Sequence, residues 1–160
     1  VRGGADLPQD YDEAKKLFLR AGELGGTTSY YNVAKAYYRG ESVDVDMKKA
    51  KHYWELASMG GNVVARHNLG SLEGRTGNMN RAVKHFMIAA GAGWDASLTV
   101  IRECFMNGYV NKDDFEKALR AHKESKDEMN SDQRATAAAF LGQNGLLPPD
   151  LALEQFYGQN

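Results

Sequence analysis

The sequence lacks a second cysteine, a long apolar run and an excess of charge of one sign. Its single cysteine, Cys104, has no partner for a disulfide within the chain, which favours a reducing compartment such as the cytoplasm or an organelle. No apolar run approaches the roughly 20 residues that a membrane-spanning helix needs, and no signal peptide is visible. The formal net charge is −1, so the whole-chain charge does not favour nucleic acid or anionic lipid as a partner.

Motifs for catalysis or metal binding are missing as well. The histidines form neither an HExxH motif nor a pair four residues apart; they are His52, His67, His85 and His122. The stretch "GSLEGRTG" lacks the Lys-Ser/Thr pair of a phosphate-binding loop. Cys104 lies beside an expected core position and is interpreted as a small buried apolar residue. We therefore expect no enzyme, no metal site and no cofactor.

The sequence does contain an internal repeat. Five positions recur 36 residues earlier and 32 residues later with the same chemistry. They are Asp46, Ala50, Trp54, Ala57 and Gly61, preceded by Asp10, Ala14, Phe18, Ala21 and Gly25 and followed by Asn78, Ala82, Phe86, Ala89 and Gly93. A weaker copy follows at Asp114, Ala118, His122 and Ser125. Each copy has helical apolar spacing after an N-cap residue, and the first three end at a glycine suited to positive φ, so each predicts a helix.

The repeat explains a cluster that looks catalytic, His52-Tyr53-Trp54-Glu55. Trp54 recurs as Phe18 and Phe86, which predicts an aromatic side chain that fills the space between helices. His52 aligns with other basic residues, so we expect it on the solvated outer face. The same face is expected to hold the neighbouring lysines Lys48, Lys49 and Lys51.

A second helical pattern lies between these copies, in "SYYNVAKAYYRG" (29–40), "ARHNLGSLEG" (65–74) and "SLTVIRECFMNG" (97–108). Its core columns are Val33, Leu69, Ile101 and Tyr37, Glu73, Phe105. The change of period predicts that the middle copy has lost four residues from the loop around "GRTGN". Alternating helices that cannot bury their apolar stripes alone predict an all-α fold, an α/α solenoid of antiparallel helix pairs.

These motifs resemble the Sel-one-like repeat, a member of the tetratricopeptide-like helical superfamily. The matching positions are Ala65, Asn68, Leu69 and Gly70 in the first helix and Asp46, Lys49, Ala50, Ala57 and Gly61 in the second. The resemblance implies a superhelix of helix pairs and a non-catalytic role in protein interaction. Two residues depart from the pattern: Glu73 stands where the family usually has tyrosine, and Arg102 where it has glycine.

The domain prediction follows from the repeat. We expect an array over 1–126, with a partial unit at 1–25 and full units at 26–61, 62–93 and 94–126. Residues 127–160 are expected to cap it, with one helix that begins at Ser131 and spans 131–142, and a second over 148–157. Because the first unit lacks its leading helix, we expect the natural protein to extend upstream.

The partner-binding face is expected on the first helices, which line the concave side of such arrays. Tyrosine and arginine are enriched at interface hot spots. The predicted binding residues are Tyr30, Tyr31, Lys35, Tyr38, Arg66, His67 and Leu98. Alternatively, Tyr30 or Tyr31 packs against an upstream repeat.

The sequence therefore predicts a scaffold for a protein or peptide partner. Three alternatives remain open: a structural subunit packed through its solenoid ends in a larger complex, an enzyme-associated regulatory domain, and, disfavoured by the charge, an RNA-binding repeat.

Overall fold

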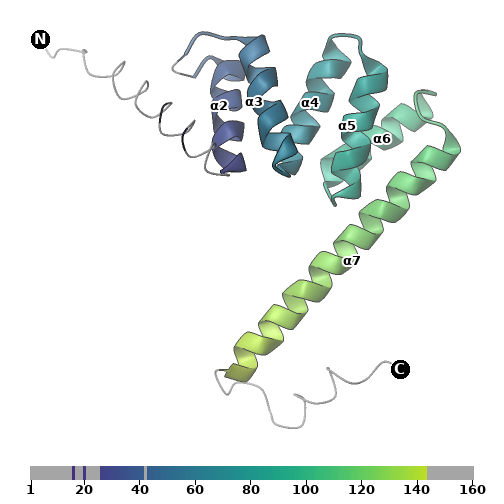
Figure 1. The fold of residues 1–160 in the computed structure, drawn as a ribbon. Coiled ribbons are helices and arrows are strands. Elements are labelled where there is room, and N and C mark those ends of the chain that lie inside the picture. Colours follow the sequence, from purple (N-terminus) through teal and green to yellow (C-terminus); the bar gives the residue numbers. More distant parts are fainter. Residues whose placement is uncertain (1–15, 17–19, 21–25, 42, 144–160) are drawn as a thin grey trace, which may run out of the picture. The chain divides into compact units, whose positions relative to one another are not determined.

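The computed structural model describes residues 16, 20, 26–41 and 43–143, and these residues form helices and no strand. The helices with described bounds are α2 (Thr27–Arg39), α3 (Met47–Met59), α4 (Val63–Arg75), α5 (Met79–Gly91), α6 (Asp95–Met106) and α7 (Lys112–Gln143) (Figure 1). The predicted all-α class is confirmed.

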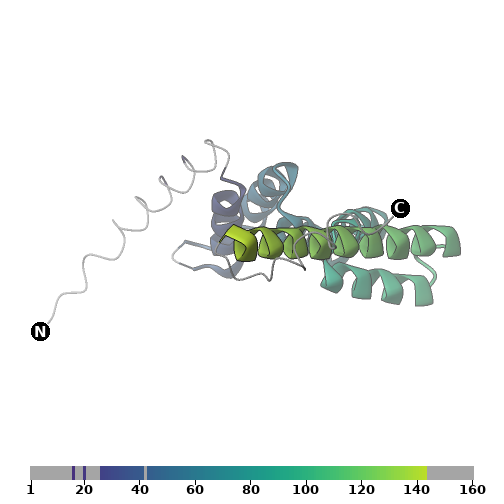
Figure 2. The same cartoon turned by 90° about the horizontal axis from the view of Figure 1, so that it is seen from below.

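Consecutive helices from α2 to α6 pack side by side, in the order of the sequence (Figures 1 and 2). The closest pairs are α2 with α3 and α4 with α5, which are the first and second helices of the predicted units. Each pair also packs against the helix that follows it. This arrangement confirms the predicted solenoid, in which each helix pair buries its apolar stripe against its neighbours.

The connecting loops account for the change of period. Residues 40–46 join α2 to α3, whereas only residues 76–78 join α4 to α5, which is four residues fewer. The predicted deletion near "GRTGN" is therefore confirmed. Gly61 and Gly93, predicted to end the second helices, adopt positive φ angles of 91° and 84°, a conformation that glycine takes without a steric penalty.

Helix starts agree with the prediction in two units and differ in one. The Asp46 carboxylate accepts a hydrogen bond from the Lys49 backbone N–H at 3.0 Å, as predicted. Asn78 is the N-cap residue of α5, as predicted, but its side chain makes no cap hydrogen bond, and its Nδ2 donates to Glu73. At the start of α7 the capping residue is Asn111, whose Oδ1 accepts from the Asp114 N–H at 2.8 Å. The helix start predicted at Asp114 was therefore wrong.

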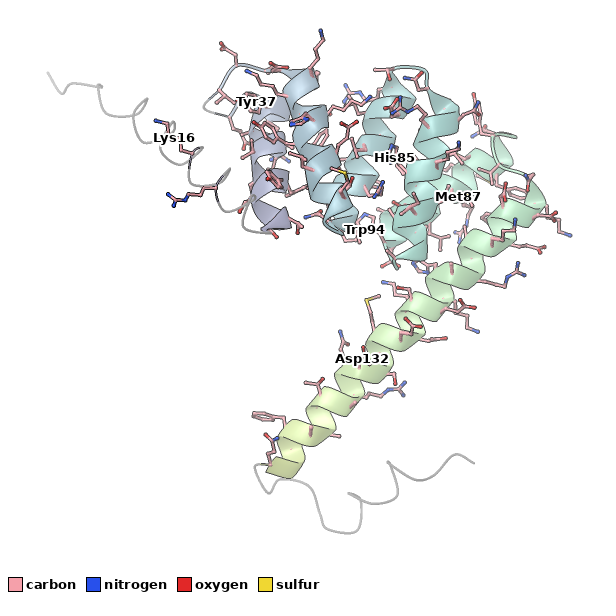
Figure 3. All side chains as sticks on the ribbon, viewed as in Figure 1. Lys16, Tyr37, His85, Met87, Trp94 and Asp132 are labelled. Atoms are coloured by element: carbon pink, nitrogen blue, oxygen red, sulfur yellow. The ribbon has the colours of Figure 1, made fainter. Side chains whose placement is uncertain are left out.

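Two apolar clusters form the core of the array. The first contains Val33, Ala34, Tyr37, Ala50, Trp54, Ala57, Ala65 and Leu69, and the second Ala82, Phe86, Ile101, Cys104, Val110 and Ala118. Trp54 and Phe86 are only 3% and 5% exposed, as their repeated column predicts. Tyr37 points from α2 into the first cluster (Figure 3) and stacks on Tyr53 of α3 with ring centroids 5.9 Å apart.

Cys104 is buried in the second cluster. Its burial raises the pKa of the thiol, which agrees with its interpretation as a packing residue. The adjacent residue Phe105, expected in the core, is only partly buried and stacks on Phe115 of α7 at 4.6 Å.

The helix start predicted at Ser131 was wrong. α7 runs unbroken from Lys112 to Gln143, and Asp132 lies within it (Figure 3). The stretch 112–141 holds neither proline nor glycine, so nothing in its backbone chemistry ends the helix before the alanine-rich part. The chain divides into two compact units, one through His122 and one from Lys123 onward. The partial unit at 1–25, apart from residues 16 and 20, and the helix predicted at 148–157 lie outside the described residues.

Candidate partner-binding groove between α2 and α4

A groove of about 270 Å³ lies between the first helices α2 and α4. Its lining residues are Tyr31, Lys35, Tyr38 and Arg39 from α2, Trp54 from α3, and Asn68, Ser71, Leu72 and Arg75 from α4. In each first helix the lining residues follow the spacing i, i+3 or i+4, i+7 or i+8, so they share one helix face. We call this the α2–α4 groove.

Packing of α3 against both helices gives the groove a fixed aromatic lining. Trp54 is almost fully buried, and its ring lies 5.1 Å from that of Tyr38, measured between centroids. The indole Nε1 is buried and finds no hydrogen-bond acceptor among the described residues. An aromatic residue held in this way gives a partner a rigid surface at little cost in conformational entropy.

The charged residues of the groove are all basic. Arg39 pairs with Glu41, outside the groove, through exposed side chains at 3.2 Å. Arg75 donates to the Tyr38 hydroxyl, a neutral acceptor from the opposite wall. Among the described residues the Lys35 side chain has no hydrogen bond or ion pair. No Asp or Glu among the described residues lines the groove, so the positive charge of this lining is only partly compensated.

Three of the seven predicted binding residues line this groove, namely Tyr31, Lys35 and Tyr38. The other four do not. Tyr30 packs on Tyr53 with ring centroids 6.4 Å apart, and the Arg66 guanidinium donates to the Ser58 carbonyl at 3.1 Å.

His67 and Leu98 also lie away from the α2–α4 groove. The His67 ring nitrogen Nδ1 lies 2.8 Å from the Ser97 hydroxyl, and the ring packs on Phe86. Burial lowers the pKa of His67, which favours the neutral imidazole. Leu98 is partly buried on α6. A role for these residues and for Tyr30 and Arg66 in partner binding stays a prediction.

Comparison with known protein families identifies one family whose model matches this chain. A model of the Sel1 repeat matches residues 2–26, 27–62 and 63–94, which is more than half of the chain. The chain belongs to the Sel1 repeat family. A search of curated proteins finds no match. The fourth unit predicted at 94–126 is not among the matched stretches.

Family membership carries a general function. Sel1 repeats generally mediate protein–protein interactions, and Sel1 repeat proteins are typically non-catalytic modules. Within residues 26–41 and 43–143, no helix is long and apolar enough to cross a membrane. The same part of the chain contains no group of three or more His, Cys, Asp or Glu residues that could hold a metal ion.

The sequence contained a signal for groove residues that the prediction missed. Arg39 and Arg75 are 36 residues apart, the same step that separates the first two units. They therefore occupy one column of the Sel1 repeat and line the same groove. Asn68, which matches the family motif, and Ser71 also line the groove but were not among the predicted binding residues.

A second polar feature of the Sel1 repeats is a hydrogen-bond network around Glu73 of α4. This side chain is 1% exposed. Its carboxylate accepts hydrogen bonds from Lys51 Nζ at 2.7 Å and Asn78 Nδ2 at 2.9 Å, and Arg81 Nη2 lies at 3.4 Å. The hydrogen bond from Lys51 is the main reason that the pKa of Glu73 is lowered, although burial opposes it.

The Glu73 network corrects the prediction for Lys51. That lysine was expected on the solvated face with Lys48 and Lys49, but it reaches inward and is bonded to a buried carboxylate. The network joins α3, α4 and α5 through side chains. Because its partners come from the helices packed around it, we interpret the Glu73 network as a structural link between α3, α4 and α5.

Proposed function

We propose that the chain is a non-catalytic scaffold and that the α2–α4 groove is its recognition surface. The general role of Sel1 repeats in protein interaction supports the first part of this proposal. The second part is carried by one observation: Tyr31, Lys35 and Tyr38 of α2 face Arg75 of α4 across a groove with an aromatic lining. Tyrosine and arginine around a well-packed pocket are the usual composition of an interaction hot spot.

The lining of the groove supports binding over chemistry. Ser71 supplies the only aliphatic hydroxyl among the described lining residues, and it donates to the His67 carbonyl at 3.3 Å. A serine nucleophile needs an adjacent general base, and none of the described residues that line the groove is a histidine or carries a carboxylate. Lysine, arginine, asparagine and tyrosine are instead suited to hydrogen bonding of a bound peptide.

The size of the groove indicates how a partner would use it. A stable protein interface buries about 1,600 Å² in total and involves roughly 20–30 residues on each side, whereas nine described residues line the groove. We infer that the groove holds the anchoring side chains of the partner and that neighbouring exposed surface supplies the rest. Hot-spot residues surrounded by weaker contacts are typical of such interfaces.

Site-specific photo-crosslinking in the source cell tests this proposal. A photo-reactive amino acid is placed at Lys35 in the groove and, as a matched control, at Lys84, an exposed position on the second helix α5. We expect a discrete crosslinked partner from position 35 that is absent from position 84. Identical adducts from both positions, or none from position 35, would contradict the assignment of the groove.

A further inference from the structure

We propose that the α2–α4 groove receives a short acidic segment of its protein partner, with carboxylates on either side of one apolar side chain. This inference rests on the proposed function, because it names the chemistry that the same groove selects. It follows from the charge of the lining, from the positions of the cations, and from the limited extent of the basic surface.

The first argument is charge complementarity. Within the part of the chain that the structure describes, the lining contains Lys35, Arg39 and Arg75 and no acidic residue. Arg75 bonds to a phenol, and the Lys35 ammonium has no hydrogen-bond or ion-pair partner among the described residues. A ligand carboxylate therefore adds attraction without displacing an internal partner of Lys35, whereas a basic ligand is repelled.

The second argument is the placement of the cations. Lys35 and Arg39 are four residues apart on α2, so they lie one turn apart on the same wall. Arg75 stands on the opposite wall, where it meets Tyr38. Leu72 contributes an apolar side chain to the lining, beside Trp54. A segment with carboxylates on both sides of an apolar residue can pair with the cations of both walls while its apolar side chain contacts Leu72.

The third argument decides between a short peptide and a longer polyanion such as RNA. The basic columns do not continue into the next unit: Glu103 follows Lys35 and Ser71, and Asn107 follows Arg39 and Arg75. Glu103 of α6 and Asn107, which follows its last residue, are both exposed. A phosphate backbone that ran along the first helices would meet Glu103 after one unit, whereas a short acidic segment would not.

Tryptophan fluorescence gives a direct readout of this binding. The chain has 2 tryptophans: Trp54 lines the groove, and Trp94 is 37% exposed before α6. With Trp94→Phe as the parent protein, the emission of Trp54 alone is followed. The probe is a synthetic peptide with glutamates around one leucine, compared with the same peptide carrying glutamines.

We expect the glutamate peptide to change Trp54 emission, and binding to weaken as salt screens the charges. Lys35→Ala should weaken binding by about 2- to 5-fold, the effect of one partly exposed ion pair, and Lys35→Glu by roughly tenfold or more. Lys84→Glu makes the same change of net charge on α5 and should leave the affinity unchanged. Unaltered far-ultraviolet circular dichroism would show that the variants are folded.

Each of the following outcomes would refute one part of the proposal. Equal affinity for the glutamine peptide, or equal weakening by Lys84→Glu, would refute acidic selectivity while leaving the crosslinking test of the groove intact. Tighter binding of single-stranded RNA than of the acidic peptide would refute the choice of partner class. Acidic-peptide binding without a partner crosslinked at position 35 would refute the proposed function rather than the chemistry of the groove.

Discussion

Replacement of Glu73 by glutamine should destabilise the Sel1 repeats by about 2–3 kcal/mol at neutral pH. The carboxylate is buried, with Lys51 Nζ on Oε1 at 2.7 Å and Asn78 Nδ2 on Oε2 at 2.9 Å. Glutamine keeps the shape but has one acceptor and one NH₂ group. Whichever way its amide turns, a donor faces either the Lys51 ammonium or the Asn78 amide.

The magnitude follows from the bonds that the change removes. A hydrogen bond to a charged group contributes about 1.5–3 kcal/mol, and a neutral one about 0.5–1.5 kcal/mol. Glutamine loses the charge of the first bond and retains at most one of the two acceptors. Because Lys51 and Arg81 can turn toward water, the side chains being 34% and 60% exposed, the cost stays below that of two buried charges left unpaired.

The pH dependence of the difference gives a sharper test. The pKa of Glu73 is lowered below 4.5 in the folded state, mainly by the hydrogen bond from Lys51. The stabilisation by the carboxylate is therefore fully present above about pH 4.5 and is lost as the pH falls through the folded-state pKa. The difference in free energy of unfolding between wild type and Glu73→Gln should therefore be constant from neutral pH down to about pH 4.5 and should shrink at lower pH.

Urea unfolding followed by circular dichroism, repeated from pH 7 downward, measures this difference. Glu103→Gln is the matched control, because the same chemical change falls on an exposed glutamate of α6 and should alter stability by less than about 0.5 kcal/mol. A Glu73→Gln variant as stable as the wild type at pH 7, or a difference that does not vary with pH, would refute the reasoning.

Three further predictions concern the core. Trp54→Ala should lower the free energy of unfolding by about 3–5 kcal/mol, because the side chain is 3% exposed; chemical denaturation measures it. Gly70→Ala should destabilise by about 1–3 kcal/mol, since its Cβ would lie 2.8 Å from the Phe86 ring, whereas Gly74→Ala, with neighbours at 3.6 Å and beyond, should be neutral or stabilising in the same assay. Cys104, buried with a raised thiol pKa, should react with a thiol reagent in denaturant and only slowly in the native protein.

The fold was predictable because the same core and cap residue types recur at equivalent positions in several units. Trp54 and Phe86 occupy one column, and Ala50 and Ala82 another, so one pattern of large and small residues appears in successive units. Independent copies that agree reduce the chance that a local pattern is accidental. The change of period even located the loop that is shorter in the structure, residues 76–78.

Predictions that rested on a single local signal failed more often. Ser131 is a good N-cap residue, but a cap acts only where the helix already begins, and α7 continues through this position. Asn78 is the N-cap residue of α5, but its side-chain oxygen accepts no cap hydrogen bond, and its Nδ2 donates to the buried Glu73 carboxylate. In both cases neighbouring structure, which local sequence does not specify, decides which interactions the residue makes.

The candidate site was predictable in part for the same reason. The first-helix face was expected from the architecture, and Tyr31, Lys35 and Tyr38 line the groove that the structure contains. Which residues face a groove and which face the next helix depends on the rotation of each helix about its axis. The repeat does not fix that rotation, so Arg66 and His67 were assigned to a surface although their side chains contact neighbouring elements.

Glu73 stands where the family pattern usually has tyrosine, and comparison with the preceding unit, which has Tyr37 at this position, explains how the glutamate is accommodated. Tyr37 and Glu73 occupy one column, and Lys49 and Arg81 are equivalent residues of the following helices. Lys49 Nζ lies 5.0 Å from the Tyr37 ring centroid, and Arg81 Nη2 lies 3.4 Å from Glu73. Both units therefore pair this column with a cation, through an aromatic face in one and a carboxylate in the other. The carboxylate replaces the tyrosine without loss of that pairing because Lys51 and Asn78 supply its remaining hydrogen bonds.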